Sequence, residues 1–214
     1  MRSISRLRHR RAEDGFTVVE VMITSVLLLV VTTMIFEGMI SLQRAGHRVQ
    51  ALVNNEQDVR FVVTQMVRDI RAANPLVAFS GTATDYKTRA EMMIGPANGT
   101  QQRVRWVYDT TVGSPTYQTL RRQVVSADGA TVLSSITRLS HVRNNVRTPA
   151  VDVFNYVSQS GTDLVVAGNG NDVGNCAINV EVVITADSNP GPEPFTVRSN
   201  AELRNRLPGG VGCG

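Results

Sequence analysis

The sequence predicts an α+β protein in which a long N-terminal α-helix, transmembrane in its first half, packs on an antiparallel β-sheet head. Three observations lead to this prediction. Residues 16–36 form an almost uncharged apolar run, residues 49–70 carry apolar side chains at helical spacing, and short β-like runs separated by turn residues follow Pro75. The chain is 42% hydrophobic with only 17 glycines and 8 prolines among 214 residues, which excludes a disordered or collagen-like protein.

The apolar run is long enough to cross a bilayer. Its 21 residues would rise about 31 Å as a helix, and Glu20 is its one charged side chain. Residues 1–15 precede it with five arginines and two acidic residues. This bias predicts a cytoplasmic N-terminus. A secretory signal peptide would have a shorter apolar core that ends in a small-residue cleavage site, so we expect the apolar segment to be retained.

The helix is predicted to continue well beyond the apolar run. From Val49 to Ile70 the apolar residues recur at i, i+3, i+4 and i+7, with polar residues on the opposite side. Asn74-Pro75 should stop the helix, because the residue before a proline is disfavoured in helical conformation. One helix over residues 16 to about 73 is therefore expected, apolar all round at first and then apolar on one face.

The remainder of the chain reads as an antiparallel sheet. Ala127-Asp128-Gly129-Ala130 and Gly161-Thr162-Asp163 are predicted turns. No second pattern of helical length is available to connect parallel strands, which favours antiparallel pairing, with the long helix across one face. The predicted strands cover residues 103–108, 117–125, 132–139, 151–157, 163–167, 177–186 and 195–203.

The positive charge of the chain is concentrated in its leader. The formal net charge is +4, and the five arginines and two acidic residues of positions 1–15 account for +3 of it. From Phe16 onward 17 basic residues face 16 acidic ones. A nucleic-acid partner therefore does not follow from the overall basicity.

Residues 10–21 resemble the processing site of type IV prepilins and pseudopilins. The matching features are a short basic leader, Gly15, Phe16, a glutamate (Glu20) at the fifth position after Gly15, and the apolar run. The resemblance implies cleavage after Gly15, where a glycine leaves the backbone unobstructed, and N-methylation of Phe16. It also implies that Glu20 pairs with the Phe16 amine of a neighbouring subunit during assembly, since each charge compensates the other in an apolar setting.

Two segments of the head are similar to minor pilins of the PilW kind and to the J-type minor pseudopilin of type II secretion. Residues 153–161 read VFNYVSQSG, a strand and turn of the form F-x-Y-x-x-x-x-G. Residues 177–185 and 195–205 are similar to the closing pair of strands in the same group, with an L-R-N end at 203–205. One departure from many major pilins is Glu37, which stands where they carry a proline.

The resemblance gives each part of the chain an expected role. Its implied partners are a prepilin peptidase, a major pilin and other minor pilins. The protein would cross the inner membrane once, with its N-terminus in the cytoplasm and its head in the periplasm, and then enter a pilus at the cell surface or a periplasmic pseudopilus. The expected divisions are a cleaved leader (1–15), a transmembrane or filament-core half-helix (16–40), an amphipathic half-helix (41–74) and a globular head (75–214).

The sequence offers little that resembles catalytic chemistry. His9, His47 and His141 are the only histidines, and none lies at metal-ligand spacing to another histidine or a cysteine. No phosphate-binding glycine loop or nucleophile elbow is present. We expect no enzyme, no cofactor and no metal. Residues 168–175, GNGNDVGN, offer oxygen ligands but lack the spacing of a calcium loop, which favours a plain turn-rich loop.

The head contains two further candidate sites, a disulfide and a DNA-contact surface. Cys176 and Cys213 would form one disulfide in an oxidising periplasm, and two free thiols are the alternative. Arg121 and Arg122 lie on a predicted strand near Trp106, a composition that single-stranded DNA surfaces use. Strand alternation turns Trp106 toward the core, so a solvated strand face is the favoured interpretation.

The sequence therefore predicts a minor pilin that acts in the priming or tip complex of a type IV pilus. The alternatives are a J-type minor pseudopilin of a type II secretion system, a major pilin, and a pilus-borne adhesin or DNA-uptake receptor.

Overall fold

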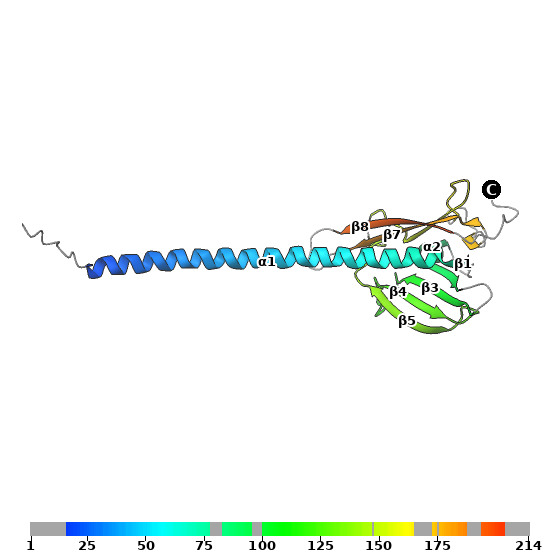
Figure 1. Cartoon of the computed structure of the whole chain (residues 1–214), viewed down its shortest axis with the longest axis horizontal. Helices are drawn as coiled ribbons and strands as arrows, with labels where there is room; N and C mark the ends of the chain where they lie inside the picture. Colours follow the sequence, from blue (N-terminus) through cyan, green and yellow to red (C-terminus); the bar gives the residue numbers. More distant parts are fainter. Residues whose placement is uncertain are drawn as a thin grey trace, which may run out of the picture. The chain divides into compact units, whose positions relative to one another are not determined.

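The computed structural model describes residues 16–77, 83–95, 100–146, 148–164, 173–174, 176–187 and 194–203. The chain forms two compact units, Met1–His47 and Arg48–Gly214, which are described separately below. In chain order the elements are α1 (Val18–Arg71), β1 (Ala73–Leu76), α2 (Ala83–Thr88), β2 (Arg89–Ile94), β3 (Gln102–Tyr108), β4 (Leu120–Val125), β5 (Val132–Leu139), β6 (Phe154–Val157), β7 (Asn179–Ala186) and β8 (Phe195–Glu202) (Figure 1).

The long helix α1 is one uninterrupted element of 54 residues. It ends at Arg71, and the Asn74-Pro75 pair lies in β1 immediately afterwards, as the proline rule predicts. In the first unit every described residue, from 16 to 47, is exposed. In the second unit the helix becomes half-buried, with its buried residues at Val59, Val62, Val63, Met66, Val67, Asp69 and Ile70. One face of the helix is thus buried in this unit, at the apolar positions that the helical spacing predicted.

The second unit contains two antiparallel sheets. Sheet A is a meander in the order β1-β2-β3-β4-β5, and sheet B has the order β6-β7-β8. The α+β class with antiparallel strands is thus confirmed, whereas the single sheet that we expected is divided in two. The chain leaves sheet A after β5, and Val142 then forms an isolated bridge to Ala186 of sheet B.

The C-terminal part of α1 lies between the two sheets (Figure 1). On one side Asp69 receives hydrogen bonds from sheet A, and on the other side Arg71 Nη2 donates to the carbonyl of Asn200 in β8, 3.2 Å away. The three layers share one apolar core. Its most deeply buried members include Met66, Ile70, Ala90, Met92, Val104, Trp106, Leu120, Phe154, Tyr156, Val180, Val182, Ile184 and Ala201.

A tyrosine from sheet B ties the sheets together. Tyr156 in β6 is 1% exposed, packs edge-on against Tyr86 of α2, and donates a hydrogen bond to the carbonyl of Arg89 at the start of β2. Burial raises the pKa of this hydroxyl above its usual range. Phe154 stacks beside it, so both aromatic positions of the F-x-Y segment lie in the core.

The predicted strands correspond to β3 through β8 with later starts in three cases. Residues 117–119 form a turn in which Gln118 has a φ of 61°, so β4 begins at Leu120. Of the predicted strand 163–167, Asp163 forms an isolated bridge to Val157 and 165–167 lie outside the described residues. The turn at 127–130 is confirmed, with Gly129 at positive φ. The turn predicted at 161–163 lies earlier, at 158–161, where the Gly161 N–H donates to the carbonyl of Ser158 and Gly161 has a positive φ.

Three elements were not predicted from the sequence. These are β1, β2 and the six-residue helix α2. Helix α2 is too short to show periodicity. Strand β2 could not be recognised from polar and apolar alternation, because its charged residue Glu91 is buried, at 2% exposure, where the pattern would place an exposed side chain.

We predict that Asp69→Ala lowers the free energy of unfolding by about 2–3 kcal/mol. Asp69 Oδ2 accepts from Trp106 Nε1 at 3.1 Å and from Arg122 Nε at 2.8 Å, so its removal leaves a buried indole N–H and a half-buried guanidinium unpaired. Urea unfolding of the full chain in detergent micelles, followed by the fluorescence of the single tryptophan, measures the change.

Asp58→Ala is the matched control for this prediction. Asp58 lies 11 residues earlier on the same helix and is exposed, so its loss should change stability by less than about 0.5 kcal/mol. Equal effects of the two substitutions would contradict the anchoring role of Asp69.

Candidate functional site

The candidate site is the N-terminal end of α1, where Phe16 and Glu20 lie. Thr17 caps the helix, since its Oγ1 and its carbonyl both accept from the Glu20 N–H, at 3.2 and 3.0 Å. Glu20 is thereby held in the first helical turn, three residues after Thr17, as the glutamate of a T-x-x-E capping pattern. A carboxylate there is favoured by the positive end of the helix dipole.

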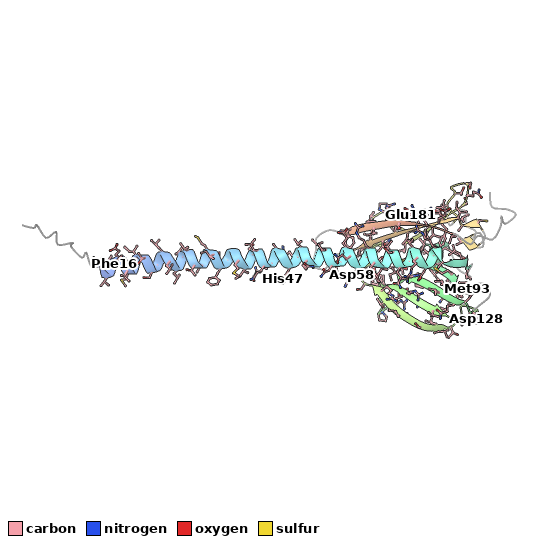
Figure 2. The ribbon with its side chains drawn as sticks, viewed as in Figure 1. Phe16, His47, Asp58, Met93, Asp128 and Glu181 are labelled. Carbon is pink, nitrogen blue, oxygen red and sulfur yellow. The ribbon has the colours of Figure 1, made fainter. Side chains whose placement is uncertain are left out.

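The side chain of Glu20 is available to a partner. In the part of the chain that the structure describes, its carboxylate takes part in no ion pair or hydrogen bond. The preceding Phe16 is 76% exposed and lies just before the helix (Figure 2). Cleavage before Phe16 would place a new amine one helical turn from this carboxylate, within the same short segment.

The helix behind Glu20 presents apolar side chains on all sides. Figure 2 shows them projecting from the ribbon of the first unit, and they include Val19, Met22, Leu28, Leu29, Ile35 and Phe36, each at least 60% exposed. An exposed apolar surface of this extent requires lipid or protein around it. The helix has a stretch with a mean hydropathy of 2.4, which is long and apolar enough to cross a membrane.

The few hydroxyl groups in this segment are satisfied by the helix itself. Thr24 Oγ1 donates to the carbonyl of Glu20 at 2.8 Å, Thr32 Oγ1 to Leu28 at 2.6 Å, and Thr33 Oγ1 to Val30 at 2.8 Å. Ser25 makes the same kind of bond to Val21. Since each hydroxyl bonds its own backbone, none needs water, which suits an apolar environment. Glu20 is left as the one strongly polar side chain near the start of the helix.

Gly15, the predicted cleavage position, lies outside the described residues, as do His9 and Cys213. Cys176 is 8% exposed and disulfide-bonded. Its pairing with Cys213 stays a prediction. The loop considered as a calcium site, residues 168–175, also lies outside the described residues, except for 173–174. Among the described residues, no group of three or more His, Cys, Asp or Glu side chains could hold a metal ion.

Arg121 and Arg122 do not form one surface. They are neighbours in β4 and therefore point to opposite faces of sheet A. Arg122 turns toward α1 and pairs with Asp69 at 2.8 Å, and Arg121 turns outward, 3.5 Å from Asp109. Trp106 is fully buried on the helix side, as strand alternation predicted. The suggested combination of Trp106 with both arginines is therefore not brought together on an exposed face.

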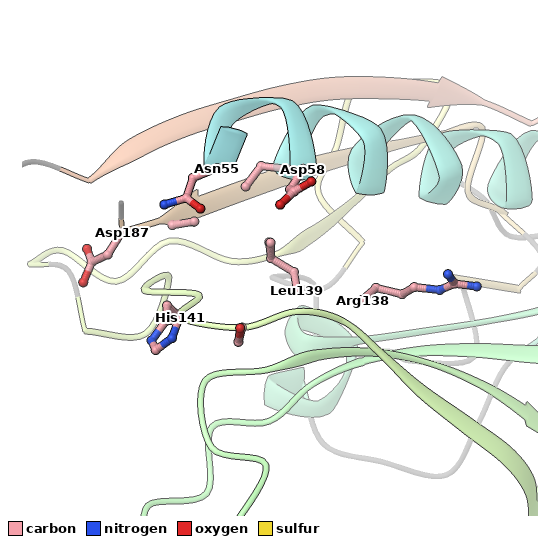
Figure 3. Close-up of a pocket in the computed structure, with 9 residues that line it drawn as sticks. Asn55, Asp58, Arg138, Leu139, His141 and Asp187 are labelled. Carbon is pink, nitrogen blue, oxygen red and sulfur yellow. The ribbon is translucent and has the colours of Figure 1, made fainter. Parts of the chain in front are cut away.

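A polar cavity of about 300 Å³ lies where α1 meets the segment after β5. Asn55 and Asp58 project from the helix toward Leu139, and Arg138, His141 and Asp187 complete the labelled lining (Figure 3). Asp187 is engaged by an ion pair with Arg143. His141, a histidine for which the sequence assigns no role, adopts a φ of 60°.

Sheet A contains a buried charge cluster that could not be recognised from the sequence. The side chain of Glu91 in β2 is fully buried. It forms ion pairs with Arg89, with Arg103 at 2.6 Å and with Arg105 at 2.5 Å. Residues 103–105 read R-x-R, and strand alternation places both arginines on the same face of β3. Their acidic partner is not visible in the sequence, because the antiparallel register that sets Glu91 opposite Arg105 is a tertiary feature.

The comparison with known proteins bears on this N-terminal end. Residues 10–36 match the family model described as the prokaryotic N-terminal methylation motif, and no curated protein matches the chain. The matched segment contains Gly15, Phe16, Glu20 and most of the exposed apolar helix described above. A motif of this type implies processing by a prepilin peptidase and other pilins as partners, and the apolar helix is compatible with membrane anchoring. The motif indicates a prepilin-type protein, a type IV pilin or pseudopilin.

Proposed function

We propose that this protein is a minor pilin that acts in the priming or tip complex of a type IV pilus. In this proposal the chain is stored in the inner membrane by residues 16–40, cut after Gly15 and methylated at Phe16. It then enters the base of a filament through the same helix. The role is structural, and no catalytic step is assigned to any residue.

The observation that carries the proposal is Glu20 near the start of a helix whose first exposed segment, residues 16–36, has no other charged side chain. An ionised carboxylate in lipid costs at least about 2.5 kcal/mol on insertion scales, so it is retained only where it has a partner. The Phe16 amine of an adjacent subunit would provide one and would also draw the two helices into register. The free energy released by pairing them in an apolar setting favours insertion into the filament.

The head supports a minor rather than a major role through its resemblance to the PilW-like group. The F-x-Y segment of that resemblance is structural here, because Phe154 and Tyr156 join sheet B to α2 and β2. The J-type pseudopilin of type II secretion shares this segment, so it is the alternative within the class. A pilus-borne adhesin is the alternative in which the helix only carries a binding head.

The mature chain is predicted to begin with N-methylated Phe16. Intact-mass spectrometry of the protein from a cell with an active prepilin peptidase should show the loss of residues 1–15 and the gain of one methyl group. Gly15→Val should prevent the loss, because a branched side chain obstructs the backbone beside the scissile bond.

Gly38→Ala is the control for the processing experiment. Gly38 has open space where a Cβ would lie, so the substitution leaves the helix undisturbed and should leave processing unchanged. A working protein that retains Met1 to Gly15 would contradict the cleavage.

Glu20→Ala is predicted to be cleaved normally but to enter filaments at least about tenfold less than the unaltered chain. The loss corresponds to about 1.4 kcal/mol or more of assembly free energy, a modest share of a charge pair in an apolar setting. Quantitative immunoblotting of sheared filaments against the membrane fraction measures it.

Glu37→Ala is the matched control, since Glu37 is a second exposed glutamate on the same helix. It should enter filaments within about twofold of the unaltered chain. If both variants assembled equally well, Glu20 would have no specific part in assembly.

A further inference from the structure

The second unit exposes one aromatic side chain on α1, on the face of the helix that turns away from the core. Phe61 is 66% exposed, whereas the other aromatic residues that the structure describes in this unit are at least partly buried. The fully buried Ile70 lies nine residues later, about 180° around the same helix. A phenyl ring gains little from contact with water, so its exposure here indicates a contact surface for another molecule.

Two hollows lie on this face of the helix. The smaller, of about 110 Å³ and mainly apolar, is lined by Phe61, Thr64, Gln65 and Arg68. The larger, of about 400 Å³, shares Thr64 and Arg68 and also includes Arg71. We call the exposed side of α1 from Phe61 to Arg71 the outer helix face. A helix surface with hollows beside its ridges is the kind of surface on which a second helix packs.

The outer helix face carries positive charge that no described side chain pairs with. Arg68 and Arg71 are exposed, and neither forms an ion pair among the described residues. Arg71 donates one hydrogen bond, to the carbonyl of Asn200. The two arginines are three residues apart and therefore lie one helical turn from each other on the same side. No acidic residue lines either hollow.

The carboxylates nearest to these arginines in the chain are engaged or directed elsewhere. Asp69 is buried and pairs with sheet A, and Glu56 pairs within the helix at 2.6 Å. Asp58 points toward the end of β5 (Figure 3). Glu202, at the end of β8, forms no ion pair with either arginine. Both guanidinium groups are therefore accessible to a carboxylate from another molecule.

We propose that the outer helix face docks an acidic amphipathic helix of a different filament subunit. Aliphatic side chains of that helix would pack on Phe61 and into the apolar hollow, and carboxylates one turn apart would face Arg68 and Arg71. Aromatic and arginine side chains are the types enriched at protein interfaces. The inference rests on the proposed function, which places other subunits beside α1.

The charge of the outer helix face disfavours a second copy of this chain as the partner. Two copies joined through the same face would set arginine against arginine, and like charges across an interface lower affinity. A helix that carries carboxylates is attracted to the same face. This discrimination suits a subunit that is present in few copies and has unlike neighbours.

Photo-crosslinking in cells that make the complete filament system tests the docking. The photoreactive residue p-benzoylphenylalanine replaces Phe61 in the full chain, and mass spectrometry identifies the cross-linked peptides from membranes and from sheared filaments. We expect an adduct with another filament subunit, in a helical segment that carries aspartate or glutamate within two turns of the cross-linked residue.

Charge reversal then tests the role of Arg68 in this adduct. Arg68→Glu should lower the adduct yield at least about tenfold, because it sets like charges against each other. Arg68→Lys, which keeps the charge, should lower the yield less than about threefold. Exchange of the partner's carboxylate for arginine should restore the adduct of the Arg68→Glu chain.

Two controls separate this contact from general exposure and charge. The photoreactive residue at Val112, which is 80% exposed in the β3–β4 loop, should give no such adduct. Arg198→Glu, on sheet B with a side chain 65% exposed, should leave the yield from position 61 within about twofold. Circular dichroism of each purified chain in detergent micelles checks folding.

Four results would overturn the docking: no adduct from position 61, an adduct with a second copy of this chain, an adduct with a segment that lacks carboxylates, or an unchanged yield in a folded Arg68→Glu chain. Filament incorporation is measured in the same cells. A chain that enters filaments without this adduct contradicts the docking alone. A chain that gives the adduct in membranes but is absent from filaments contradicts the pilin proposal alone.

Discussion

The constraint on which the rest of the structure depends is the change of surface along one continuous helix. Every described residue of α1 before Ala51 is exposed, and most of the side chains before Phe36 are apolar. From Val59 onward the same helix buries one face among two sheets. An exposed apolar surface of this extent requires lipid or other protein around it, and the helix is compatible with membrane anchoring. In the second part, the two sheets of the head cover the buried face of the helix.

The head is organised around the buried side of that helix. Met66 and Ile70 provide apolar packing, and Asp69 provides the polar fixed point through Trp106 and Arg122. A buried carboxylate is stable only when its oxygens are paired, so it fixes the rotation of the helix against sheet A. Tyr156 links sheet B to β2 through its hydrogen bond to the carbonyl of Arg89. Together these contacts explain how two small sheets make one core.

The parts of the molecule that depend on local rules could be predicted from the sequence. The apolar run, the helical spacing and Asn74-Pro75 together define α1 to within a few residues, and Trp106 follows strand alternation into the core. The division into two sheets could not be predicted, since it depends on which strands pair across long separations. The same is true of Glu91, whose three arginine partners are brought together only by the register of β2, β3 and the turn after β4. At the N-terminal end the motif residues were recognisable at once, because their spacing along a single helix is local.

The central claim, that this chain is a minor filament subunit, is tested most directly by counting its copies. Absolute quantification by mass spectrometry of purified sheared filaments gives the ratio of this chain to the main filament subunit. The account predicts that the chain is present in its mature form at no more than about a few copies per filament, as expected for a closed complex at one end. Its absence from intact filaments, or a ratio near that of the main subunit, would contradict the account.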